Sequence, residues 1–202
     1  MSENTPGAVL DFWFGPMQHG FTTHDRGELW FRSTPANDAH IRERFETLVL
    51  SAAAGELDGW KSIPEGRLAL VILLDQLPRN IYRGTARAFD FDPKASELAE
   101  EGIARGDDLA LPLEQRAFLY LPLEHQESAA TQERCVALYE RLRDETPKGY
   151  RERTGNYLRF AQQHRDVILR FGRFPHRNRV LGRPSTDEEV RYLRESRGSF
   201  GQ

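Results

Sequence analysis

Residues 128–145 read SAATQERCVALYERLRDE, and the spacing in this stretch indicates how the chain folds. Cys135, Leu138, Tyr139 and Leu142 lie three or four residues apart or side by side, which places them on one face of an α-helix. Polar and charged residues fill the other positions, so the opposite face suits solvent. The stretch therefore predicts an amphipathic helix of five turns.

The same helical spacing recurs on both sides of this stretch. It predicts further helices at residues 6–14, 24–31, 35–54, 68–77, 92–105, 112–122, 152–171 and 185–195. Prolines or capping residues begin most of them, and Gly55 and Gly106 end two. Pro78 and Pro122 are expected to interrupt their helices. No alternating pattern and no Asn-Gly turn predicts a strand.

This organisation predicts an all-α fold. We expect one domain over residues 1–202, with about eight or nine helices stacked as antiparallel pairs. The sequence shows no repeat of fixed period that would identify a repeat protein.

Composition limits the classes of function. The 39% hydrophobic content suits a packed core, and no apolar run approaches the roughly 20 residues of a membrane span. The N-terminus lacks a signal-peptide pattern, and Cys135 is the single cysteine, so we expect a cytoplasmic protein without an intramolecular disulfide. The overall negative charge and the absence of a reader motif disfavour nucleic-acid binding.

Charge is distributed unevenly along the chain. Residues 1–150 hold 16 Lys and Arg against 25 Asp and Glu, whereas residues 151–183 hold nine Arg against two acidic residues. Arginine suits forked recognition of carboxylate and phosphate groups. Two interpretations stay open: the arginines of the second segment pair with the acidic first part of the fold, or they bind an anion.

Residues 164–183 read HRDVILRFGRFPHRNRVLGR and form the most unusual segment. Gly172 and Pro175 predict a stiff corner that presents Arg173, His176, Arg177 and Asn178 to an anionic ligand, and protonation of His176 near pH ~6.5 would strengthen binding. His164 lies on the apolar face of its helix, where a hydrogen-bonded core histidine is the simpler interpretation.

A second candidate segment reads DQLPRN at 75–80 and follows a strongly apolar run. Charged groups at the end of a buried helix need partners, so we expect this segment to meet residues 164–183 and Asp75 to pair with Arg173 or Arg177. Glu124, His125 and Glu127 are possible metal ligands, but they lack the spacing of a chelating pair, and no metal site is predicted.

Four strings carry a resemblance to a known family: VLDFWFG at 9–15, DQLPRNIYRGT at 75–85, FLYLPLEH at 118–125 and the segment at 164–183. They resemble the mainly bacterial family catalogued as domain of unknown function 924. The resemblance implies a tetratricopeptide-like helical superhelix and no established activity. Gln126 departs from the family pattern, in which serine is common at this position.

We expect a pocket that binds a small anionic molecule, with no cofactor. Its candidate residues come from both segments and the turn between them: Asp75, Arg79, Asn80, His125, His164, Arg173, His176, Arg177 and Asn178. The alternative is a helical scaffold that binds a peptide or protein partner in a groove. A metal-dependent enzyme is a weaker alternative, and no catalytic residue is assigned.

Overall fold

The computed structural model describes residues 4–195, and its architecture is all-α. The α-helices of this part of the chain are α1 (Pro6–Phe14), α2 (Gly27–Phe31), α3 (Pro35–Ala54), α4 (Pro64–Val71), α5 (Leu77–Ile81), α6 (Asp92–Arg105), α7 (Asp107–Ala110), α8 (Leu113–Glu124), α9 (Ala129–Glu145), α10 (Arg151–Phe171) and α11 (Asp187–Glu195). Short helical turns join them: η1 (Asp58–Ser62), η2 (Ile72–Gln76), η3 (Ala86–Phe89), η4 (Lys148–Tyr150) and η5 (Pro175–Arg177).

Capping side chains set the helix boundaries that the sequence predicted. The Thr34 hydroxyl accepts a hydrogen bond from the backbone of Asn37 at the start of α3, and Gly55 ends that helix at a positive φ of 85°. At α11, the Thr186 backbone donates to the Glu189 carboxylate at 2.7 Å and the Glu189 backbone donates to the Thr186 hydroxyl at 3.2 Å. Thr186 and Glu189 therefore form a capping box at the start of α11.

A short antiparallel hairpin departs from the expectation that the chain has no strands. β1 (Met17–Gln18) pairs with β2 (Phe21–Thr22), and the loop residues His19 and Gly20 both have positive φ, 53° and 85°. Such a loop is normally made by Asn-Gly, and His19 replaces the asparagine. The hairpin was missed because its two-residue strands are too short to show an alternating pattern.

The two prolines expected to interrupt helices are accommodated in different ways. Pro78 lies in the first turn of α5, where its missing N–H removes no intrahelical bond, and the wider π-helical turn η2 joins α4 to α5 directly before it. Pro122 lies inside α8, which continues to Glu124. The expectation that this helix ends at Pro122 is wrong, since a proline so close to a helix end disturbs few backbone bonds.

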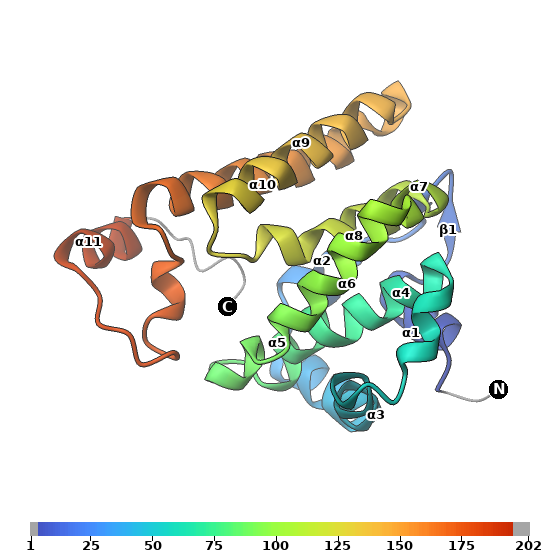
Figure 1. Ribbon diagram of the computed structural model, residues 1–202, viewed down its shortest axis with the longest axis horizontal. Coiled ribbons are helices and arrows are strands. Elements are labelled where there is room, and N and C mark those ends of the chain that lie inside the picture. The colour runs from blue at the N-terminus through green and yellow to red at the C-terminus, as the bar shows by residue number, and fades with distance from the viewer. Residues whose placement is uncertain (1–3, 196–202) are drawn as a thin grey trace.

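The core surrounds the continuous segment α4–η2–α5, which packs against α1, α3, α6 and α8. Figure 1 shows α9 and α10 as a long pair along one edge of the molecule, next to α8 and α6. The short link through η4 makes that pair antiparallel. Within the described residues, no helix combines the length and the apolar character needed to cross a bilayer.

Two positions inside this core, Gly66 and Cys135, are closely packed. Gly66 of α4 lies so close to η1 that an added Cβ would overlap the Trp60 carbonyl oxygen. Cys135 of α9 is fully buried with its Sγ 3.8 Å from the Tyr120 carbonyl oxygen, and burial raises the pKa of its thiol well above the ordinary value.

The chain after α10 forms a smaller unit at the end of the molecule. Gly172 ends α10 in the left-handed conformation, and η5 and α11 follow. Val167, Ile168 and Phe174 form a small apolar cluster that is separate from the main core. Figure 1 shows α11 at the far end of the molecule from the N-terminal helices.

Candidate functional site

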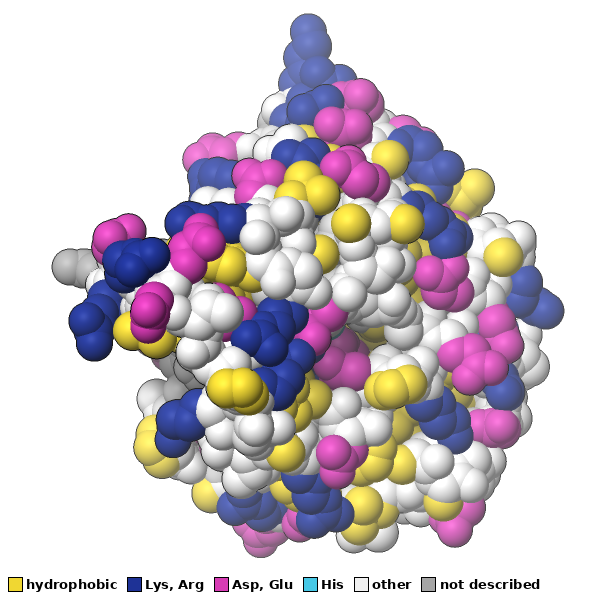
Figure 2. Space-filling view, turned by 60° about the vertical axis from the view of Figure 1, so that its left-hand side comes forward, with side chains coloured by type: hydrophobic (Ala, Val, Ile, Leu, Met, Phe, Trp, Pro, Cys, Tyr) yellow, Lys and Arg dark blue, Asp and Glu magenta, His cyan; other side chains and the backbone are white. Residues whose placement is uncertain are grey.

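A pocket with a volume of about 570 Å³ opens among α2, α5, α8 and α10. Its charged lining comprises five arginines and two histidines against three carboxylates: Arg32, Arg79, Arg83, Arg153, Arg159, His125, His164, Asp25, Glu114 and Glu124. Its aromatic lining comprises Trp30, Phe31, Tyr157 and Phe160. Figure 2 shows one face of the molecule hollowed near its middle, where Lys and Arg side chains lie beside Asp and Glu. The pocket thus combines positive charge with an aromatic wall.

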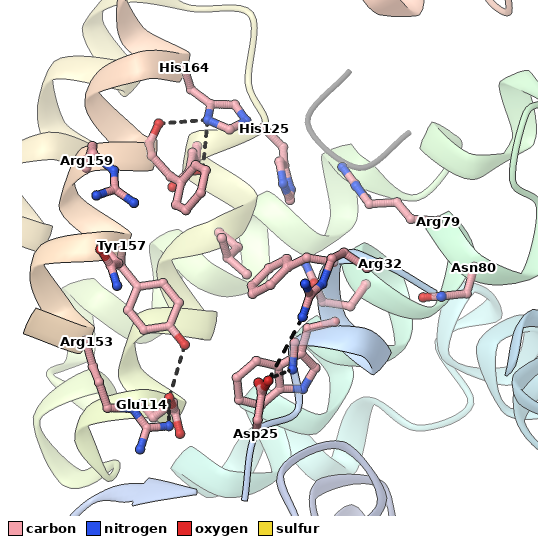
Figure 3. Close-up of a pocket in the computed structure, with 18 of the residues that line it drawn as sticks. Asp25, Arg32, Arg79, Asn80, Glu114, His125, Arg153, Tyr157, Arg159 and His164 are labelled. Carbon is pink, nitrogen blue, oxygen red and sulfur yellow. Dashed lines mark hydrogen bonds and ion pairs between the residues drawn. The ribbon is translucent and has the colours of Figure 1, made fainter. Parts of the chain in front are cut away.

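The fold brings four of the candidate residues to this pocket. Arg79 and Asn80 line it from α5, His125 from the end of α8, and His164 from α10. Figure 3 shows His125 between His164 and Arg79. Asp75 lies behind His125 with 0% of its surface exposed. These residues are far apart in sequence, and the pocket is where the two candidate segments come together.

Asp75 and His125 form a buried hydrogen-bonded pair. Asp75 Oδ1 lies 2.7 Å from His125 Nδ1, and the Gln76 side chain donates to the other carboxylate oxygen. Burial by itself would raise the pKa of Asp75, but the charge of Arg79 and the hydrogen bonds with His125 and Gln76 outweigh it and hold the pKa far below its ordinary value. Burial, and then the charge of Arg79, lower the pKa of His125. An ionised carboxylate therefore supports a neutral imidazole.

Carboxylates of the protein already hold the basic groups on the α5 wall. Arg79 pairs with Asp75 at 3.3 Å and makes two hydrogen bonds with Asp92 at 3.0 and 3.1 Å. Asn80 donates to Asp38 at 2.9 Å, and Arg83 donates to the same carboxylate at 2.7 Å. Asp75 is thus paired with Arg79 and His125, and the expected pairing with Arg173 or Arg177 is wrong. The i, i+4 spacing of Asp75 and Arg79 on one helical stretch explains this pairing.

His164 is both a core residue and a lining residue. Its Nδ1 lies 3.0 Å from Glu124 Oε1 and 2.9 Å from the Phe160 carbonyl oxygen. Both neighbours are hydrogen-bond acceptors, so Nδ1 carries the proton. The expectation of a hydrogen-bonded core histidine is confirmed, and the ring also borders the pocket.

A hydrogen-bonded network around Glu114 was not predicted from the sequence. Glu114 of α8 is buried and accepts hydrogen bonds from Arg153 at 2.8 Å, from the Tyr157 hydroxyl at 3.2 Å and from the Thr22 backbone at 2.7 Å. Burial and the neighbouring Glu114 raise the pKa of Tyr157 well above its ordinary value. The network fixes α10 to α8 and to the hairpin. No local motif in the sequence indicates it, because its members lie far apart along the chain.

Among the described residues, the pocket arginines Arg159 and Arg32 lack close ion pairs of the kind that neutralise Arg79 and Arg83. Arg159 is exposed on α10; its guanidinium lies 5.5 Å from the centre of the Phe160 ring, and it makes no ion pair within residues 4–195. Arg32 reaches Asp25 only at 4.0 Å, with both side chains largely exposed. Figure 3 shows Arg159 projecting from α10 and Arg32 from the N-terminal part of the chain. Both guanidinium groups can therefore take a further partner.

At the η5 corner, protein carboxylates occupy most of the donors that were expected to bind an anion. Arg173 donates to Glu189 at 2.7 and 2.9 Å, and Asn178 donates to the same carboxylate at 3.3 Å. Asn178 also accepts from Arg183 at 3.0 Å. Arg173, His176, Arg177 and Asn178 do not line the pocket. Glu189 lies after the arginine-rich segment, so Arg173 fits neither interpretation, whereas Arg177 pairs with Asp92 and Arg183 pairs with Glu127 of the acidic first part.

Arg177 and His176 lie directly behind the pocket. Arg177 is buried between the rings of Phe89 and Phe174, with its guanidinium 4.7 and 4.6 Å from their centres and 3.6 Å from Asp92. Burial and the charge of Arg79 lower the pKa of Arg177 to about 10, and burial and the charge of Arg177 lower the pKa of His176 to about 3. The expected protonation of His176 near neutral pH is therefore wrong.

The expectation that the two segments meet is confirmed at Asp92, whose carboxylate contacts both Arg79 and Arg177. Figure 3 shows Arg79 at the pocket wall. Across residues 4–195, no three His, Cys, Asp or Glu side chains are grouped as a metal site would require.

Comparisons with known proteins find similarity over nearly the whole chain. Residues 9–197 match the model of a family described as bacterial proteins of unknown function, DUF924. A solved structure of a protein of unknown function from Agrobacterium tumefaciens is 41% identical, with a TM-score of 0.80, and the match covers 95% of this chain and 97% of that one. No curated protein matches the sequence.

Proposed function

This chain belongs to the DUF924 family of bacterial proteins of unknown function, and from the chemistry of its pocket we propose that it binds a small organic anion. The observation that carries the proposal is Arg159, a pocket arginine without an ion pair among the described residues. A guanidinium offers forked donors that match a carboxylate or a phosphate. Arg32 supplies a second guanidinium, which is only loosely held by Asp25.

The pocket also indicates the rest of the ligand. Its volume of about 570 Å³ lies within the range of about 300–1,000 Å³ that small-molecule sites occupy. Trp30, Phe31 and Phe160 give it an aromatic wall beside the arginines. We therefore propose a ligand with at least one anionic group and a flat apolar part, such as an aromatic carboxylate or an aryl phosphate.

This proposal places the anion in the pocket and not at the η5 corner. Arg173 and Asn178 are held by Glu189, and neither borders the pocket. Arg79 lines the pocket and Arg177 lies behind its wall, and their positive charges add to the attraction of an anion in a poorly solvated site.

Calorimetric titration with terephthalate and phenyl phosphate tests the proposal. We expect Arg159→Ala to weaken binding about 10- to 100-fold, because a charge-assisted hydrogen bond contributes about 1.5–3 kcal/mol. The matched control is Arg170→Ala, which removes an exposed arginine of the same helix outside the pocket. The proposal fails if neither anion binds the wild-type chain, or if both variants bind as the wild type does.

Binding of a peptide or protein segment is a second candidate function. Phe31 and Phe160 border the pocket with 47% and 46% of their surfaces exposed, and the tetratricopeptide-like superhelix implied by the resemblance would supply a groove. Peptides selected by phage display on the wild-type chain should lose binding to a Phe31→Ser, Phe160→Ser double variant. Selected peptides that bind both proteins equally would exclude this surface.

A further inference from the structure

Anion binding alone does not require the Asp75–His125 pair, and its arrangement resembles what a general base needs. Asp75 is an acceptor, so the proton between Asp75 Oδ1 and His125 Nδ1, 2.7 Å apart, is donated by the imidazole. A neutral imidazole protonated at Nδ1 keeps its lone pair on Nε2. The His125 side chain is 14% exposed and borders the pocket, whereas Asp75 lies behind it with no exposed surface.

The surroundings of His125 keep it neutral. Asp75 of η2 and Asp92 of α6 face it with negative charge, and Arg79 of α5 faces it with positive charge. Its ring centre lies 6.3 Å from that of His164 on α10, and His176 of η5 is close enough to interact with it electrostatically. Burial and Arg79 outweigh the carboxylates, so the pKa of His125 falls below its ordinary value. A base in this state accepts a proton at neutral pH without first losing one.

The residues that line the pocket indicate which nucleophile His125 can activate. Among the described residues that border the pocket there is no serine, threonine, cysteine or lysine. The Tyr157 hydroxyl is hydrogen-bonded to Glu114, which favours its neutral form. Water is therefore the nucleophile that His125 can activate.

Building on the proposed anion site, we propose that the pocket hydrolyses small aromatic esters that carry a carboxylate, with His125 as the general base. Nε2 takes a proton from a water molecule while the water oxygen bonds to the ester carbonyl carbon. The bond from this carbon to the alcohol oxygen then breaks, and the alcohol oxygen receives the proton from Nε2. One water is consumed, and an acid and an alcohol are released, so atoms and charges balance.

The arginines have separate parts in this step. Arg159 and Arg32 bind the substrate carboxylate at the mouth of the pocket. The former carbonyl oxygen gains one negative charge in the tetrahedral intermediate, in addition to the charge of the substrate carboxylate, and the positive charges of Arg79 at the wall and Arg177 behind it stabilise this oxyanion. Asp75 is a positioning residue, because it fixes the tautomer of His125 and does not border the pocket.

Hydrolysis of mono-4-nitrophenyl terephthalate, followed by release of 4-nitrophenolate, tests the proposal. Its carboxylate lies across the ring from the ester and cannot attack it. We expect saturable hydrolysis by the wild-type chain, inhibition by terephthalate, and a loss of about 10²- to 10⁴-fold in kcat in His125→Gln, the range for removal of a general base. His40→Gln, which replaces an exposed histidine of α3 outside the pocket, should leave the rate unchanged.

Binding of terephthalate to His125→Gln, measured by calorimetry, shows whether that variant is folded and separates the two proposals. If terephthalate binds and the wild-type and His125→Gln chains hydrolyse the ester equally, general-base catalysis is refuted and the anion site stands. If terephthalate does not bind the wild type, both proposals fail. A loss in His164→Gln with none in His125→Gln would also refute the assignment.

The role of Asp75 has its own readout in the pH dependence of kcat/KM. In Asp75→Asn the carboxylate that favours the protonated imidazole is gone, so we expect the acidic limb of the profile to move to lower pH. The amide can also donate to Nδ1 and shift the His125 proton to Nε2, which lowers kcat. A variant with reduced stability but an unmoved acidic limb would show that Asp75 is only structural.

Discussion

At the scale of single residues, burial decides which ionisable groups of this protein carry charge. His125 and His176 lie within one polar cluster with Arg79 and Arg177, and desolvation is the largest cause of the lowered pKa of each histidine. Asp75 keeps its charge because the charge of Arg79 and the hydrogen bond with His125 compensate its burial. The cluster thus holds its positive charge on arginine and leaves its histidines neutral.

We predict that His176 stays neutral over the physiological range. Its pKa is lowered to about 3, so the folded state binds fewer protons than the unfolded state below the ordinary histidine value of about 6.5. Its contribution to stability is complete above that value and is lost as the pH falls toward about 3. In ¹H–¹⁵N spectra, the His176 imidazole signals should not titrate between about pH 5 and about pH 8. A midpoint inside that interval would contradict the prediction.

At the scale of elements, the tight turn from η1 into α4 leaves no room for a side chain at Gly66. Gly66 allows α4 to pass directly against η1, whereas Gly155 lies within α10 with open space where a Cβ would be. Contact with the Trp60 carbonyl oxygen therefore requires a glycine at position 66, whereas nothing in the structure requires one at position 155.

We predict opposite effects of Gly66→Ala and Gly155→Ala on the free energy of unfolding. The first places a methyl group on the Trp60 carbonyl oxygen and should cost about 1–3 kcal/mol or more, as overpacked cores do. The second should stabilise the chain by roughly 0.5–1 kcal/mol, because alanine favours a helix interior. Urea denaturation followed by circular dichroism measures both. Equal effects of the two substitutions would show that the close contact between Gly66 and the Trp60 carbonyl oxygen does not limit the side chain at this position.

At the scale of the whole molecule, the chain has one main core and a smaller C-terminal unit. Glu189 holds α11 to Arg173, Arg170 pairs with Glu188, and the Phe171 and Tyr192 rings lie 5.0 Å apart. Among the described residues, these contacts join α11 to the end of α10 and to the turn after it, whereas α8 is buried among the central helices.

We predict that α11 opens without unfolding of the rest. Its backbone amides should exchange with deuterium faster than those of α8, because local opening needs only a few exposed contacts to break. Mass spectrometry of peptic peptides gives both rates in one experiment. Glu189→Gln should speed exchange in α11 and leave α8 unchanged; equal acceleration in both helices would show a single cooperative unit.

The sequence predicted the helical architecture well, because each amphipathic stretch carries its own spacing and caps. It predicted the pocket only in part. Arg79 and His125 stood out as polar residues next to apolar runs, but Arg159 and Phe160 become lining residues only through the way α10 packs across α8. The Arg173 partner was within reach, since Glu189 belongs to a capping box recognisable in the sequence. Its second role as an ion-pair acceptor depends on the turn at η5.

The burial of Cys135 has a practical consequence for experiments on the pocket. A thiol that is fully enclosed and has a raised pKa should not react with maleimides while the chain is folded. The unmodified sequence then serves as its own background for site-specific fluorophores. Cysteines introduced at Phe31 and Phe160, on opposite elements at the mouth of the pocket, would carry a donor and an acceptor dye. Energy transfer between them would report any narrowing of the mouth when an anion enters.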